Sequence, residues 1–305
     1  MRVRVLGAAA GGGFPQWNCN CANCSGLRRG TLRATSRTQS SIAIASTAER
    51  WLLCNASPDV HRQMAATPAL APREGVRDSR IAAVLLVDGQ IDHATGLLLL
   101  REQSSPLEVW CTDAVHEDLT TDLPILNVLE RYCGVRRQRI GTDSVAFRVP
   151  ALPGIVVRAL PVAGKPGPYS RHRESPRVGD NIGLMFKDER SGRQLLYAPG
   201  LAEVSAQIEA ALAECDCVLV DGTFWTDDEL VSAGISGKRA RDMGHLPQSG
   251  PGGMLEVLGR LDPRTRRILI HINNTNPILN EDSAERAELD ARAIEVAFDG
   301  MEIEV

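Results

Sequence analysis

The 305-residue chain has no stretch approaching the roughly 20 consecutive apolar residues that a membrane-spanning helix requires. It shows no secretory signal, because Arg2–Leu6 reads as a strand where a signal would place a long apolar region. It also has no excess of positive charge: the formal net charge is −4, so no strong field attracts nucleic-acid phosphates. We therefore expect a cytoplasmic protein that binds neither nucleic acid nor a membrane.

The composition is that of a globular protein, with 43% hydrophobic and 24% charged residues, and the chain is long enough for one large α/β domain. A hairpin is predicted at Ser41–Ser46 and Arg50–Cys54, with its turn at 47–49, and an amphipathic helix at Ser283–Ala297. Two series of a hairpin followed by α/β segments, before and after about residue 150, predict two sheets packed face to face with helices outside.

A glycine-rich segment, Gly7–Gly13, follows the first strand but lacks the Lys-Ser/Thr ending of a phosphate-binding P-loop. No helical pattern follows it, so it fits a dinucleotide-binding fingerprint poorly. Glycine lets the backbone approach another group closely, and we expect this loop to lie near the active site.

Three of the eight cysteines follow the pattern C-x-C-x-x-C, at Cys19, Cys21 and Cys24, within the polar loop 17–26. In a reducing cytoplasm they are better explained by metal binding than by disulfides. Three thiolates this close repel one another unless a cation neutralises them, and zinc is their natural partner. The sequence therefore predicts a structural zinc site whose fourth ligand comes from elsewhere.

Candidate metal ligands follow three predicted strands. Asp92 and His93 come after the apolar run Ile81–Val87, Asp221 follows another strand at Val220, and His271 directly follows Ile270. Strand ends in an open sheet lie close together, so these side chains together favour a metal site. The alternative for each is structural: Asp92 caps a helix, Asp221 turns the chain, and His271 is a satisfied histidine at a strand end.

In these strand-end residues the chain resembles the metallo-β-lactamase superfamily, whose motif is His-x-His-x-Asp-His after a strand. The matching stretch is Asp88–His93, in which Asp88 and Gln90 replace the two leading histidines. His271 matches the last histidine of the superfamily. The resemblance implies an αββα sandwich of two mixed sheets with helices outside, and one metal position that keeps Asp92, His93 and His271.

The resemblance is more specific to the superfamily members that take part in pyrroloquinoline quinone (PQQ) biosynthesis, and it covers essentially the whole chain. The stretches that carry it are Gly11–Cys21, Asn55–Asp59, Gln90–His93, Val220–Trp225 and Met243–His245. It implies a single domain over 1–305, a structural zinc at the cysteine loop, a homodimer formed near that loop, and cooperation with other proteins of the pathway.

The same resemblance implies an oxygenase that hydroxylates the tyrosine of a Glu-Tyr-derived, small quinone precursor with Fe(II) and O₂. Two histidines and one carboxylate leave about half of an octahedral ion's coordination sphere open, as non-haem iron oxygenases require. Asp221 is placed to accept the phenolic proton. Arg171 and Arg173, in the basic loop Gly164–Arg177, are candidate anchors for an acidic substrate. The alternatives are a metal-dependent hydrolase and a non-catalytic carrier that takes PQQ or its precursor toward the periplasm.

His245 has two candidate roles. In a phosphodiesterase branch that shares the cysteine loop, a histidine in the matching loop completes the zinc site. In related RNA-processing hydrolases, a histidine there pairs with a carboxylate, here Asp221, to move protons. We favour the first role, as the fourth ligand beside Cys19, Cys21 and Cys24, because three thiolates need one.

Overall fold

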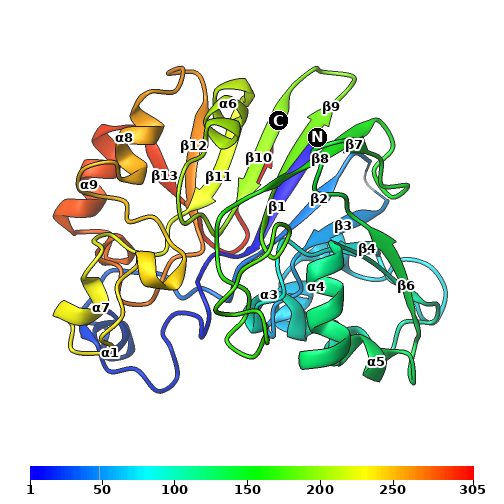
Figure 1. Ribbon diagram of the computed structural model, residues 1–305. Helices are drawn as coiled ribbons and strands as arrows, with labels where there is room; N and C mark the ends of the chain where they lie inside the picture. The colour runs from blue at the N-terminus through cyan, green and yellow to red at the C-terminus, as the bar shows by residue number, and fades with distance from the viewer. Residues whose placement is uncertain (48) are drawn as a thin grey trace.

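Two seven-stranded sheets lie face to face in the computed structural model, which describes residues 1–47 and 49–305 (Figure 1). The first sheet has the strand order β14-β1-β2-β3-β4-β5-β6. Its strands are β1 (Arg2–Gly7), β2 (Ser41–Ala45), β3 (Trp51–Cys54), β4 (Ile81–Leu85), β5 (Leu107–Cys111), β6 (Val135–Arg139) and β14 (Glu302–Glu304). Because β14 pairs with β1, the C-terminal strand returns to the first sheet.

The second sheet has the order β13-β12-β11-β10-β9-β8-β7. Its strands are β7 (Ala146–Phe147), β8 (Ile155–Pro161), β9 (Ile182–Asp188), β10 (Gln194–Ala198), β11 (Cys217–Asp221), β12 (Arg266–Ile270) and β13 (Ile294–Val296). Strands β10 to β13 run parallel, so their carboxyl ends share one edge of the sheet. Both sheets are mixed, as predicted.

The core between the sheets is built by alternation along each strand. In β12, Ile268 and Ile270 point into the space between the sheets, whereas Leu269 points to the outer face. All three are fully buried, which contributes about 1.5–3 kcal/mol for each side chain. Burial on both faces explains why these strands read as continuous apolar runs.

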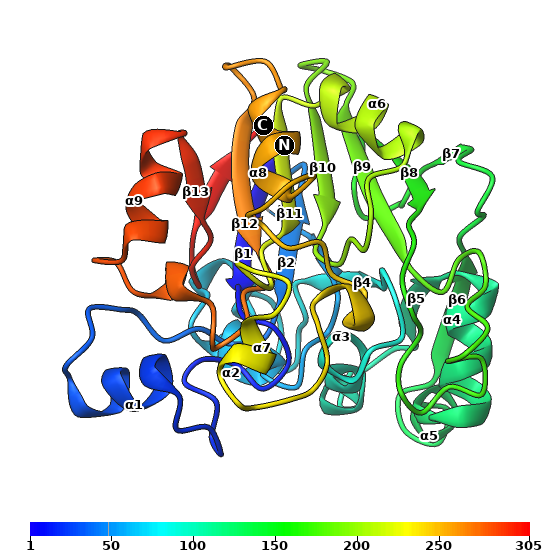
Figure 2. The ribbon, with the colours of Figure 1, turned by 60° about the vertical axis from the view of Figure 1, so that its left-hand side comes forward.

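Helices cover both outer faces, which Figure 2 shows from the side. The first sheet is covered by α2 (Val60–Ala65), α3 (Ile91–Ala94), α4 (Asp113–Glu117) and α5 (Ile125–Leu129), and the second by α6 (Ala206–Glu214), α8 (Met254–Gly259) and α9 (Ala284–Ala291). Two further helices, α1 (Ala22–Arg29) and α7 (Glu229–Ser232), lie at the end of the molecule where the loops gather. In the described parts of the chain, no helix is long and apolar enough to cross a membrane.

The structure confirms the predicted hairpin, because β2 and β3 pair antiparallel. The predicted turn 47–49 contains Ala48, which lies outside the described residues. The prediction of one helix over Ser283–Ala297 is wrong in its second half, where α9 ends at Ala291 and β13 begins at Ile294. Ala293 has a left-handed φ of 52°, which ends the helix, and Ile294 and Val296 then bury their side chains as a strand.

Candidate metal centre

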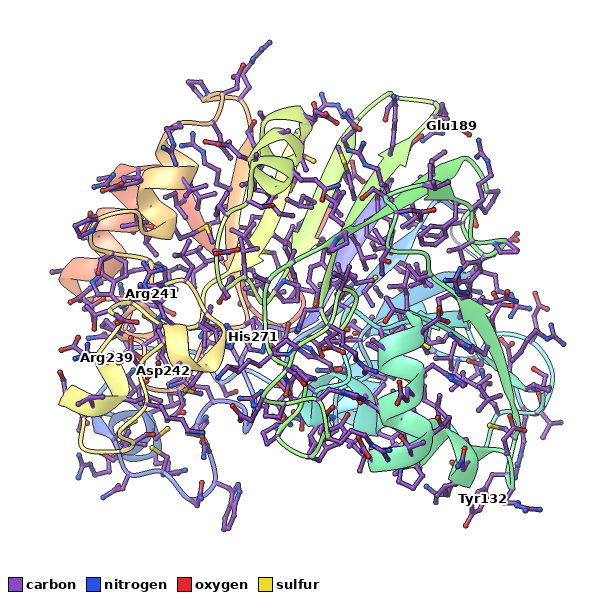
Figure 3. All side chains as sticks on the ribbon, viewed as in Figure 1. Tyr132, Glu189, Arg239, Arg241, Asp242 and His271 are labelled. Carbon is purple, nitrogen blue, oxygen red and sulfur yellow. The ribbon has the colours of Figure 1, made fainter. Side chains whose placement is uncertain are left out.

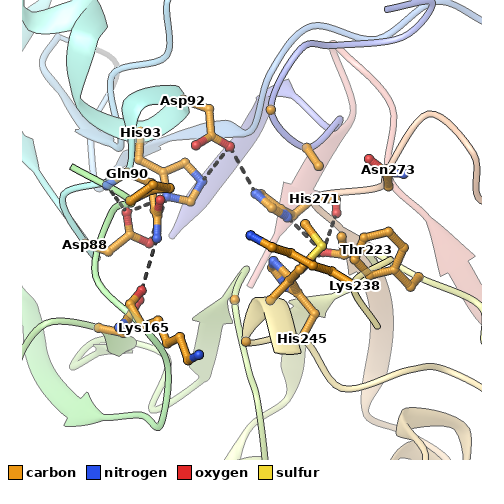
Figure 4. A pocket seen from close by; sticks show the side chains of 18 of the residues that line it. Asp88, Gln90, Asp92, His93, Lys165, Thr223, Lys238, His245, His271 and Asn273 are labelled. Atoms are coloured by element: carbon orange, nitrogen blue, oxygen red, sulfur yellow. Dashed lines mark hydrogen bonds and ion pairs between the residues drawn. The ribbon is translucent and has the colours of Figure 1, made fainter. Parts of the chain in front are cut away.

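Asp92, His93 and His271 converge on one point, although Asp92 and His271 are 179 positions apart along the chain. Asp92 Oδ2 lies 3.3 Å from His271 Nε2 and 3.9 Å from His93 Nε2. Asp92 and His93 belong to α3, just beyond β4, and His271 directly follows β12, so each sheet contributes at least one candidate ligand. Figure 3 shows His271 near the middle of the molecule, and Figure 4 shows Asp92, His93 and His271 facing one another.

His93 is held by Asp88 in the orientation that a metal ligand needs. Both carboxylate oxygens of Asp88 lie within hydrogen-bonding distance of His93 Nδ1, at 2.8 and 2.9 Å. The His93 Nε2 atom is buried and has no hydrogen-bond partner among the residues described. A carboxylate on one imidazole nitrogen, with the other nitrogen left unpaired, is the arrangement that usually surrounds a metal-bound histidine.

His271 is held in the same way by Thr223. The Thr223 hydroxyl lies 2.6 Å from Asp221 Oδ1, to which it donates, and 2.8 Å from His271 Nδ1, from which it accepts. Nε2 of His271 is therefore the atom that faces Asp92. His271 also adopts a left-handed φ of 62°, an uncommon conformation for a residue with a side chain.

These three residues fit a divalent metal ion. Ligand atoms about 2.1 Å from a shared ion lie roughly 3–3.5 Å from one another, close to the separations seen here. The donor set, two neutral imidazoles and one carboxylate, suits iron, zinc or manganese. The unpaired Nε2 of buried His93 is the observation that supports this fit most directly, because a buried polar atom normally has a partner.

The charges at this centre favour cation binding. Burial lowers the pKa of His93, but Asp88 and Asp92 have the larger combined effect and raise it to about 9. The pKa of Asp92 is held well below its usual range, because His93 and His271 together counteract its burial. Without a metal, the proton on His93 therefore occupies the place of the cation.

Metal affinity should rise with pH across the neutral range. Because the pKa of His93 is raised to about 9, the metal-free residue is protonated at pH 7, and metal binding must release that proton. We expect affinity to increase about tenfold per pH unit up to pH 9 and then level off. Calorimetric titration in buffers of different ionisation enthalpy measures the proton released. Release of no proton at pH 7 would contradict this assignment.

Replacing Asp88 with asparagine should weaken metal binding by about 10–100-fold, because the outer carboxylate fixes the tautomer and orientation of His93. Asn keeps the size of the side chain, so the fold should persist. A matched control is Asp113→Asn on the exposed start of α4, where the carboxylate pairs with Arg137 and Arg139. Competition with a metal chelator gives both affinities, and equal affinities would rule out an orienting role for Asp88.

Asp221 does not reach the cavity, in contrast to its predicted contact with a phenolic proton. It is fully buried, and its oxygens already accept hydrogen bonds from Leu201 N, from Thr223 N and Oγ1, and from the imidazole of His245. These bonds occupy the lone pairs that a proton or a metal would need. His245 lines the cavity instead, with Nδ1 2.8 Å from Asp221 Oδ2.

The expectation that His245 completes the zinc site is likewise not met. Its ring stacks on His271 at 5.3 Å, and its pKa is raised because Asp221 counteracts the effect of burial. Asp221 keeps a lowered pKa, because the charge and hydrogen bond of His245 counteract its burial. His245 and Asp221 instead form the imidazole–carboxylate pair of the second candidate role.

The three cysteine sulfurs of the predicted zinc loop lie within 4.8 Å of one another. Asn274 is the side chain that faces them, with Nδ2 at 3.1 Å from Cys19 Sγ, 3.6 Å from Cys21 Sγ and 3.4 Å from Cys24 Sγ. Backbone N–H groups of Gln16 and Cys24 also donate to the sulfurs of Cys24 and Cys21. Burial and the neighbouring Cys21 raise the pKa of Cys24 to about 12, so its thiolate needs a cation.

A cavity of about 270 Å³ opens over the three converging ligands. Loop 164–180 forms part of the cavity wall. It is held in place by two hydrogen bonds, which the Tyr169 hydroxyl donates to Gly89 O and the Ser170 hydroxyl donates to Asp118 Oδ1. Arg173 lines the cavity, as a substrate anchor should, but Arg171 points away and pairs with Asp122. The cavity is also lined by Ala10, Gly11, Lys165, Asn181, Phe224 and Lys238, so the first glycine-rich loop lies where it was predicted.

Comparison with known proteins agrees with this architecture. A family model described as a beta-lactamase superfamily domain matches residues 50–272. The two face-to-face sheets and the match to this family model define the class as a protein with the metallo-β-lactamase fold. A diphosphatase of the PhnP family, 17% identical over the whole chain with a TM-score of 0.68, shares the fold.

Full-length relatives identify the family within this class. The coenzyme PQQ synthesis protein B of Azoarcus sp. is 58% identical over 301 residues, 99% of each chain, and that of Azotobacter vinelandii is 55% identical over 305 residues, 100% of each. A zinc-bound crystal structure of PqqB from Methylobacterium extorquens is 40% identical over both whole chains, with a TM-score of 0.90. The chain therefore belongs to the coenzyme PQQ synthesis protein B family.

Proposed function

We propose that the protein acts in PQQ biosynthesis as a metal-dependent oxygenase that hydroxylates the tyrosine ring of a Glu-Tyr-derived precursor. The observation that supports this most strongly is the grouping of Asp92, His93 and His271, in which the buried His93 Nε2 has no hydrogen-bond partner among the described residues and a cavity lies above the group. Two histidines and one carboxylate are the ligand set of non-haem iron oxygenases. When bound, Fe(II) supplies the activation of O₂.

The reaction balances with an external electron donor. One oxygen atom of O₂ enters the aromatic ring as a hydroxyl group, and the other leaves as water. Two electrons and two protons come from an added reductant such as ascorbate. The cavity lies beside the metal position, so we place the substrate there.

His245 is the residue that we propose as acceptor of the phenolic proton. Its Nδ1 donates to Asp221, so Nε2 is the nitrogen available to the cavity that it lines. Asp221 acts through His245: it fixes the tautomer and stabilises the imidazolium ion formed when the proton is taken. Replacing Asp221 with asparagine should therefore lower the rate and shift its pH profile.

A second metal ion, a structural zinc, is proposed at Cys19, Cys21 and Cys24. Asn274 occupies the fourth direction, and rotation of its amide by 180° presents Oδ1 in place of Nδ2. This arrangement gives zinc three sulfur ligands and one oxygen ligand. The expected homodimer near this loop and the cytoplasmic location stay predictions.

The proposed reaction is tested by anaerobic reconstitution with Fe(II), followed by addition of O₂, ascorbate and a tyrosine-bearing precursor peptide. We expect a product that is heavier by one oxygen atom, and incorporation of label from ¹⁸O₂. Protein loaded with zinc alone is the control and should give no oxygenated product. Hydrolysis of the peptide, or equal turnover with zinc and without O₂, would overturn the proposal in favour of a hydrolase.

A further inference from the structure

Lysine is rare in this protein, and its placement is selective. The chain carries 34 basic residues, but lysine occurs only at Lys165, Lys187 and Lys238, and the others are arginine. Two of these three lysines, Lys165 and Lys238, line the cavity above the metal centre. Lys187 lies on the exposed side of β9, away from the cavity lining.

The two cavity lysines come from separate loops that touch each other. Lys165 follows Gly164 in the loop after β8, and Lys238 lies between α7 and Gly244. A Cβ atom added at Gly244 would lie 3.6 Å from Lys165 N, so the two loops are in contact. Figure 4 shows Lys165 near Gln90 and Lys238 near His245 and His271, among the residues that line the cavity.

The backbones of Lys165 and Lys238 are held by hydrogen bonds, whereas their ammonium groups have no hydrogen-bond or ion-pair partner among the described residues. The Lys165 carbonyl accepts a hydrogen bond of 3.1 Å from Gln90 Nε2, and Lys238 N donates to Ser236 Oγ at 3.1 Å. Across residues 1–47 and 49–305, the side chain of neither lysine takes part in a hydrogen bond or ion pair that would neutralise its charge. By contrast, Arg171 and Arg177, on the same loop as Lys165, are paired with Asp122 and Glu117, respectively.

The carboxylates inside the cavity do not need these cations. Asp88 is occupied by His93, and Asp92 faces His93 and His271 at the metal position. Two ammonium groups on flexible stems, each with three donors, therefore remain for an incoming ligand. Asn181 Nδ2, which is buried in the cavity lining and unpartnered within the described chain, adds a neutral donor on the same wall.

We propose that Lys165 and Lys238 bind two carboxylates of one small ligand, so that the cavity selects dicarboxylates. Carboxylates are favoured over a phosphate because the two cations come from different loops and so suit two separate anionic groups. This inference rests on the proposed function only in placing the substrate in this cavity. Lys165 and Lys238 are thus specificity-determining residues for the metal centre.

The three lysines allow a direct test by competitive labelling. The metal-loaded protein is treated with trace acetic anhydride, with and without L-glutamyl-L-tyrosine, and acetylation at each lysine is read by mass spectrometry. At ligand concentrations ten times Kd, acetylation of Lys165 and Lys238 should fall about tenfold, because only the unbound fraction reacts. Lys187 is the internal control, and its labelling should not change. L-glutaminyl-L-tyrosine amide, which lacks both carboxylates, should give no protection.

Calorimetry on variants supplies the second measurement. Lys165→Met and Lys238→Met should each weaken glutamyl-tyrosine binding by about tenfold, the effect of losing one charge-assisted contact, while Lys187→Met leaves it unchanged. Equal labelling of all three lysines in the presence of glutamyl-tyrosine, or stronger protection by pyrophosphate, would overturn the proposal. A peptide that protects both lysines but gains no oxygen would overturn the proposed reaction and leave the lysine pair standing.

Discussion

Replacing His93 with alanine is expected to abolish metal binding at the active centre and reduce turnover to background. In the proposed centre His93 supplies one of three ligands, and its loss should weaken metal binding beyond the 10–100-fold that the loss of an outer-shell partner costs. The change also leaves the buried Asp88 carboxylate without the imidazole that now pairs with it. Metal content per chain after dialysis, together with turnover, measures the effect.

Two further variants separate the loss of a ligand from damage to the fold. His93→Gln keeps a hydrogen-bond donor near Asp88 but places no imidazole at the metal position. His116→Ala, in α4 outside the cavity lining, is the matched histidine control and should bind metal and turn over normally. A folded His93→Gln protein that kept one tightly bound active-site metal would refute the role of His93.

Replacing Cys24 with serine is expected to release the structural zinc and destabilise the loop end of the molecule. Cys24 is fully buried, and its sulfur accepts a hydrogen bond from Gln16 N, so the loop is folded around it. A serine hydroxyl does not replace a thiolate as a zinc ligand. A loss of about 3 kcal/mol would lower the melting temperature by roughly 5–10 °C in a protein of this size.

Zinc analysis and calorimetric melting check this result, with limited proteolysis of the segment 17–29 as a local measure. Cys133→Ser, at a half-buried thiol outside the three-cysteine group, is the matched control and should keep its zinc and its melting temperature. A Cys24→Ser protein that retained the full metal content and the same melting temperature would show that the cysteine loop needs no zinc.

Much of the candidate metal centre could be predicted from the sequence, because its residues lie just after the ends of strands. Apolar runs locate β4, β11 and β12, and a ligand-type residue after each run marks the edge where the strands meet. The grouping of Asp92, His93 and His271 followed from that pattern and from the metallo-β-lactamase resemblance, and the structure brings these three side chains together.

What the sequence did not reveal is the direction of individual side chains. Asp221 and His245 have the residue types of either a zinc ligand or an acid–base pair, and only the fold shows that they face each other. Arg171 and Arg173 are two residues apart, yet one pairs with Asp122 and the other lines the cavity. Local sequence contains no signal that distinguishes these outcomes.

Other candidate functional residues were not predicted, although the sequence contained a signal for them. Thr223 follows Asp221 within the same strand-end segment, and Asn274 lies three residues after His271, in a polar run beyond β12. The scarcity of lysine was visible by counting and points to Lys165 and Lys238. Asp88 stands where the superfamily motif has a histidine, and its contact with His93 Nδ1 is known only from the structure.

The account depends on where the metal ions lie, and anomalous diffraction from crystals of the Fe(II)-loaded, zinc-containing protein tests this most directly. Data collected at the iron and zinc absorption edges should show iron between Asp92 Oδ2, His93 Nε2 and His271 Nε2, and zinc among Cys19, Cys21 and Cys24. An iron peak between Asp221, His245 and His271, or a pair of ions sharing the cavity, would contradict the mononuclear centre.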